Sequence, residues 1–176
     1  MPRDIKPLSK AKQEKALAAA RDHAELGAVL KGRGRAVFAE PNLPGRGKDA
    51  GDDRAIVGIY DYDRDRSIVA LVDTDEGEVL GFEETPAQFQ LSKDERSEAE
   101  ALARKDERVR SFLSRRSMDP LTRLYFPPTG SSLDTAHRYA IVFLRPSNAE
   151  RRYAVVDLSA GEVVDVLDSL VARRPA

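Results

Sequence analysis

The feature that most constrains this chain is an internal duplication. A shift of 83 residues places Leu8-Ser9-Lys10 on Leu91-Ser92-Lys93. A shift of 84 places residues 54–82 on residues 138–166 without a gap. Because each copy of a repeat forms the same local unit, the duplication limits the whole fold more than any single motif does. We expect two units, residues 1–84 and 85–176.

Each copy opens with a pattern that predicts one long amphipathic helix. Ser9 and Ser92 are suited to be helix N-caps, and Glu95 completes a capping box with Ser92. Apolar residues then recur at helical spacing. They are Ala16, Leu17, Ala20, Ala24 and Val29 or Leu30 in the first copy, and Ala99, Leu102, Val109, Phe112 and Leu113 in the second. The helices should end near Gly32 and before Pro120.

Four segments with strand character follow each helix. They cover residues 35–38, 56–62, 67–72 and 78–82 in the first copy, and 123–126, 139–144, 152–156 and 162–166 in the second. Turns rich in Asp, Gly and Ser join the later segments, so neighbouring strands should pair antiparallel. We expect an α+β fold of two tandem repeats, each a long helix packed on a four-stranded antiparallel sheet. One helix covers one face of a sheet, so the repeats could pack about a pseudo-twofold axis.

The charge balance and the residue types exclude several classes of function. The 29 basic and 30 acidic residues leave a net charge of -1, so no bulk electrostatic attraction favours nucleic acid or a membrane as partner. The lack of cysteine excludes disulfides, thiolate catalysis and Cys-based metal sites. No apolar run approaches the roughly 20 residues that span a bilayer. We expect a cytoplasmic protein, unless a secretion signal has been removed.

The closing hairpin of each copy resembles the signature turn of PepSY domains. It covers residues 70–79 and 154–163, where Gly77-Glu78-Val79 matches Gly161-Glu162-Val163. The order of elements is also similar to the tandem N-terminal domains of copper amine oxidases, and both families have a cystatin-like helix and sheet. The copper-binding histidines and the quinone-forming tyrosine of those oxidases have no counterpart here. The resemblance implies an accessory, regulatory or protein-binding module without cofactors.

Basic residues gather after the first expected helix. They are Lys31, Arg33, Arg35, Arg46 and Lys48. With intervening glycines, they could hold a phosphate or an acidic partner. The structural alternative is that cations near a helix C-terminus stabilise the helix dipole. The polar groups of a small-molecule site would be buried carboxylates, or Arg54 and Arg138, which the gapless match pairs.

The two histidines, His23 and His137, indicate little chemistry by themselves. One falls on a helix and the other at the start of a strand, and both positions are typical of structural histidines. We therefore expect no metal site and no catalytic acid-base pair.

The leading hypothesis is a non-enzymatic protein-binding module, such as an accessory, inhibitor or chaperone-like subunit. Its binding surface would be a sheet face, a strand edge at residues 78–82 or 162–166, or the loops at 41–53 and 127–136. Another protein is the expected partner; nucleic acid and membrane are not expected. The alternative hypothesis is a small-molecule binding protein or an atypical enzyme that uses a concave sheet face.

Overall fold

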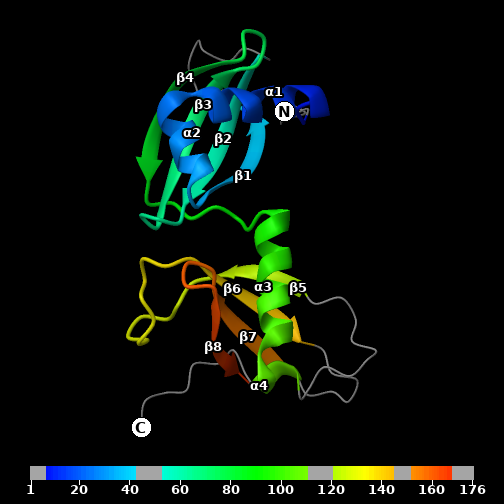
Figure 1. Cartoon of the computed structure of the whole chain (residues 1–176), viewed down its shortest axis with the longest axis vertical. Helices are drawn as coiled ribbons and strands as arrows, with labels where there is room; N and C mark the ends of the chain where they lie inside the picture. The colour runs from blue at the N-terminus through cyan, green and yellow to red at the C-terminus, as the bar shows by residue number, and fades with distance from the viewer. Residues whose placement is uncertain (1–6, 43–52, 111–120, 145–151, 168–176) are drawn as a thin grey trace, which may run out of the picture. The chain divides into compact units, whose positions relative to one another are not determined.

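A computed structural model describes residues 7–42, 53–110, 121–144 and 152–167. The chain divides into two compact units, residues 1–89 and 90–176. Each unit holds one four-stranded antiparallel sheet in which the order of strands equals their order in the chain (Figure 1). The α+β architecture with two such sheets is as predicted.

Each unit begins with two helices and continues with four strands. The first unit holds α1 (Lys10–Asp22), α2 (Ala24–Lys31), β1 (Gly34–Pro41), β2 (Arg54–Asp61), β3 (Arg66–Asp73) and β4 (Glu78–Thr85). The second holds α3 (Lys93–Lys105), α4 (Glu107–Arg110), β5 (Leu121–Tyr125), β6 (Tyr139–Leu144), β7 (Arg152–Asp157) and β8 (Glu162–Leu167). All eight strands lie where the sequence predicted them, with ends that differ by a few residues. No helix in these described ranges is long and apolar enough to cross a membrane.

Serine caps begin α1 and α3, as predicted. The Ser9 hydroxyl accepts a hydrogen bond from the backbone N–H of Lys12. In the second unit the Ser92 hydroxyl accepts from Glu95 N–H at 3.2 Å, while the Glu95 carboxylate accepts from Ser92 N–H at 2.6 Å. This reciprocal pair is a complete capping box, and it fixes the start of α3.

The prediction of one long helix per repeat is wrong, because both helices break. His23 (φ −66°, ψ 133°) separates α1 from α2, and Asp106 (φ −68°, ψ 130°) separates α3 from α4. The two breaks are 83 residues apart, so they belong to the duplicated pattern. The break in the first unit redirects α2, which leaves Ala24 exposed instead of in the core and buries Leu26.

The helices bury their apolar side chains against the central strands of each sheet. In the first unit Ala16, Ala20 and Leu26 are fully buried against β2 and β3. The match of Leu26 with Val109 holds in three dimensions, since neither side chain is exposed to solvent. Residues 111–120, with Phe112 and Leu113, lie outside the described part of the chain.

The central hairpins of the two units differ in register by one residue. Ala55 lies opposite Val72 in the first unit, and Ala140 lies opposite Val156 in the second. Both edge hairpins have a register irregularity just before these valines, which supports the match of Val72 with Val156. The strands β3 and β7 therefore match at a shift of 84, whereas β2 and β6 match at 85.

The predicted equivalence of Arg54 and Arg138 is consequently wrong. The backbone N–H of Thr74 donates to the carbonyl of Asp53, and the matching N–H of Leu158 donates to the carbonyl of Arg138. Asp53 is thus the counterpart of Arg138. The connection between the central strands is one residue shorter in the second unit, and a gapless alignment cannot represent that difference.

Candidate functional site

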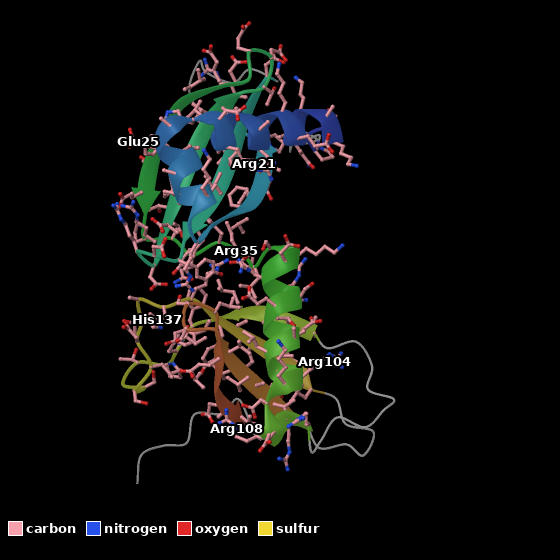
Figure 2. All side chains as sticks on the ribbon, in the orientation of Figure 1. Arg21, Glu25, Arg35, Arg104, Arg108 and His137 are labelled. Carbon is pink, nitrogen blue, oxygen red and sulfur yellow. The ribbon has the colours of Figure 1, made fainter. Side chains whose placement is uncertain are left out.

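Three of the predicted basic residues, Lys31, Arg33 and Arg35, lie in the described part of the first unit between α2 and β1. Lys31 ends α2, and Arg33 and Arg35 begin the segment that forms β1. The guanidinium carbons of Arg33 and Arg35 lie 5.8 Å and 5.4 Å from the centre of the Tyr62 ring, which is 5% exposed. These are cation–π contacts, so the two arginines cover a buried ring. Figure 2 labels Arg35 at this end of the first unit.

Of the other predicted binding residues, the structure describes Arg54 and Arg138. Arg54 begins β2, at the end of that strand remote from Arg35, and faces Asp73 across the β2–β3 pair. Arg138 belongs to the second unit. Arg46 and Lys48 lie in the segment 43–52, which is outside the described residues.

Arg138 has a structural role that the sequence did not reveal. Its guanidinium Nε lies 2.7 Å from Glu95 Oε1, and both side chains are 0% exposed. The same guanidinium donates to the backbone oxygen of Gln90, and the Arg138 N–H donates to the Ser159 hydroxyl. Glu95 therefore completes the capping box and neutralises a buried cation, which ties the start of α3 to the start of β6.

The first unit carries an ion pair at the same place with its charges reversed. Lys12 matches Glu95 at the helix shift of 83, and Asp53 matches Arg138 at the strand shift of 85. Lys12 Nζ lies 2.8 Å from Asp53 Oδ1. These side chains are 33% and 51% exposed, so solvent screens the first pair far more than the second.

His137 forms the closest histidine–carboxylate contact of the described structure. Its Nδ1 lies 2.7 Å from Asp157 Oδ2, and Asp134 Oδ2 lies 3.8 Å from Nε2. The Asp157 carboxylate also accepts from the Ala160 N–H. Burial, reinforced by the negative charge of Asp157, raises the pKa of Tyr139 to about 12, so this phenol stays protonated at neutral pH.

This cluster fastens the loop before β6 to the turn after β7. Asp157 orients the imidazole in the way a catalytic base is oriented. Ser131, in the loop before His137, accepts a hydrogen bond from Leu133 N–H and is exposed. The contacts thus support a structural role for His137, which joins the loop to the turn through Asp157. His137 is labelled in Figure 2.

The strand β4 is an exposed edge of the first sheet. It follows β3 at the end of the sheet and is exposed along most of its eight residues. Leu80 is 49% exposed and Phe82 is 38% exposed. The ring of Phe82 packs edge-on against His23 at the break between α1 and α2, with 5.5 Å between the ring centres.

The matching edge strand β8 is partly closed by a side chain. Arg108 on α4 donates to the backbone oxygen of Val163 at 2.6 Å while it pairs with Asp106. The residue that matches Arg108 is Glu25, labelled with it in Figure 2, and a carboxylate cannot donate to a strand carbonyl. The remaining edges are less open: β5 has five residues, and β1 ends in Pro41, which has no N–H.

Comparisons with known proteins add no family or relative to these structural findings. The chain matches no protein-family model and no curated protein. Within the described ranges, no group of three or more His, Asp or Glu residues is arranged to hold a metal ion. The resemblance to PepSY and amine oxidase N-terminal domains stays a prediction.

Proposed function

We propose that this protein is a non-enzymatic protein-binding module that accepts an extended segment of its partner as an added strand on β4. One observation carries the proposal: β4 is a long edge strand that exposes both its backbone and two large apolar side chains, Leu80 and Phe82. An unpaired strand edge is a ready template for another strand, and main-chain hydrogen bonds would supply much of the affinity.

The contrast between the two edges supports this assignment. Proteins usually protect their sheet edges with charges, bulges or covering side chains. In the second unit Arg108 covers a carbonyl of β8, whereas the first unit has Glu25 at that position. Since Arg108 binds one carbonyl of β8 and Glu25 cannot do the same for β4, we assign binding to β4.

The predicted family resemblance is consistent with this function. PepSY-like domains and the N-terminal domains of amine oxidases imply accessory or protein-binding roles, and strand addition is one way in which a small α+β unit performs such a role. For the alternative of a small-molecule site, Arg54 and Arg138 are not matched positions of the two units, so these arginines give it less support.

The test compares capture of partners by the wild type and by Leu80→Asp, which places a charge on the exposed edge. Val164→Asp, at the matching position of β8, is the control. We expect proteins captured by the wild type and the control to be lost with Leu80→Asp. Hydrogen exchange should show that a captured partner protects β4. Equal capture by all three proteins, with β4 unprotected, would falsify the proposal.

A further inference from the structure

The strand that carries the proposed binding edge lies in an unusually acidic stretch of the chain. Residues 67–92 contain no lysine and no arginine. They contain six acidic residues, namely Asp73, Asp75, Glu76, Glu78, Glu83 and Glu84. The charged side chains of this segment are therefore all acidic, although the protein as a whole is nearly neutral.

Half of these acids are already engaged. Asp73 accepts hydrogen bonds from the N–H groups of the β3–β4 turn. Asp75 lies 3.5 Å from Lys12, and Glu84 pairs with Arg66. These three carboxylates have roles within the unit, so they do not need an external cation.

The other half face solvent. Glu76, Glu78 and Glu83 are exposed, and none of them has an ion-pair partner within the described residues. Glu78 and Glu83 stand on β4 itself, on either side of the apolar pair Leu80 and Phe82. Carboxylates placed directly on a strand edge act on whichever strand pairs with that edge.

The pairing register places Glu78 and Glu83 on the face of β4 opposite to Phe82, whereas Glu84, which pairs with Arg66, shares the face of Phe82. Phe82 lies opposite Ala70, on the face that the helices cover, and contacts His23 there. Glu83 lies opposite Val69, on the other face. A strand added beside β4 would therefore place apolar residues next to Phe82 and the alternate residues next to Glu83.

We propose that β4 selects a basic strand, in which Lys or Arg alternates with apolar residues. This inference rests on the proposed function and names the chemistry of the partner. Opposite charges on neighbouring strands stabilise a pair and like charges destabilise it. For the same reason β4 does not pair with β4 of a second copy, since that arrangement brings the glutamates of two chains together.

Three synthetic peptides test the partner chemistry against the full-length protein. In these peptides valine alternates with lysine, with glutamine or with glutamate. We expect the lysine peptide to bind about five-fold more tightly than the glutamine peptide. It can form two ion pairs, with Glu78 and Glu83, and each exposed pair contributes about 0.5 kcal/mol. The glutamate peptide should bind most weakly. Added salt should reduce the difference between the three peptides.

Two controls separate strand addition from simple charge attraction. The lysine peptide with a central proline cannot pair along its length, so it should not protect β4 from hydrogen exchange. The double variant Glu78→Gln/Glu83→Gln should lose the preference for lysine but still bind the glutamine peptide. Glu162→Gln/Asp165→Asn, on β8, removes two charges from the matching strand and should leave the preference intact.

The outcomes distinguish this inference from the proposed function. If lysine and glutamine peptides bind equally and both protect β4, the charge preference is wrong and strand addition stands. If the proline peptide binds as well as its parent, or if no peptide protects β4, then both proposals fail. Concentration-dependent dimerisation through β4 would overturn the choice of a basic partner over a second copy.

Discussion

Glu95 shows how one residue can fulfil two structural requirements in a duplicated fold. Its carboxylate caps α3 and pairs with Arg138 in a fully buried site. The capping box could be predicted from Ser92 and Glu95, because it depends only on local spacing. The ion pair could not, because it joins residues 43 positions apart and depends on the register of β6.

The buried and exposed versions of this ion pair predict very different costs of substitution. Arg138→Leu leaves the carboxylate of Glu95 buried without its cation, so it should lower the free energy of unfolding by about 3–5 kcal/mol. Lys12→Leu removes the matching cation at an exposed site and should cost less than about 1 kcal/mol. Urea denaturation measures both. Similar costs for the two variants would contradict the assigned difference in burial.

Asp73 predicts a specific loss of stability in acid. Hydrogen bonds from the backbone N–H groups of Glu76 and Asp75 hold the pKa of this carboxyl below its usual value of 3.8. The folded state therefore favours the carboxylate. The contribution of Asp73 to the free energy of unfolding is present above the pKa of the unfolded state. It is lost as the pH falls through the lowered pKa of the folded state. Denaturation midpoints measured from about pH 5 to pH 2 should fall less steeply for Asp73→Asn than for the wild type. Asp22→Asn, at an exposed helical position, should follow the wild type.

At the scale of single elements, the strands were predictable and the helix breaks were not. Alternating apolar residues and turn residues are local signals, and the meander order of four strands also predicts which strands form the edges. The breaks at His23 and Asp106 change the backbone of one residue each and involve no proline. The difference between the edges β4 and β8 was likewise hidden, because it depends on the contact that Arg108 makes with Val163 in the second unit.

Gly27 is a residue in α2 that the break between α1 and α2 requires to be small. A methyl group at this position would lie 2.3 Å from the backbone oxygen of Arg21, because α2 turns back against the end of α1. Helix propensity alone predicts that Gly27→Ala stabilises the protein by about 1 kcal/mol. The structure predicts the opposite sign, a loss of roughly 1–3 kcal/mol from overpacking.

Thermal or urea denaturation of Gly27→Ala decides between these two predictions. Ala28→Gly, at the next and exposed position of α2, reports the propensity effect without a steric one and should cost about 1 kcal/mol. A Gly27→Ala protein more stable than the wild type would contradict the close approach of Gly27 to the backbone oxygen of Arg21.

At the scale of the whole molecule, the duplication produces two similar scaffolds with different surfaces. The elements match from the capping serines to the final hairpin, but the ion pair is reversed and one edge is covered. Divergence has therefore changed the polar groups while the apolar core has kept its pattern. This agrees with the proposal that binding belongs to the first unit, since Arg108 occupies one backbone oxygen on the matching edge of the second.

Because each core draws on residues of one unit, core substitutions should act locally. Val57 on β2 and Val142 on β6 are matched positions, 0% and 1% exposed. Replacing either by alanine should cost roughly 1–3 kcal/mol through lost burial and a small cavity. Hydrogen exchange should then accelerate in β2 and β3 for Val57→Ala, and in β6 and β7 for Val142→Ala, while the other unit keeps its wild-type rates. If either substitution accelerates exchange in both units equally, the chain unfolds as one cooperative body, and partner binding at β4 would then stabilise the second unit as strongly as the first.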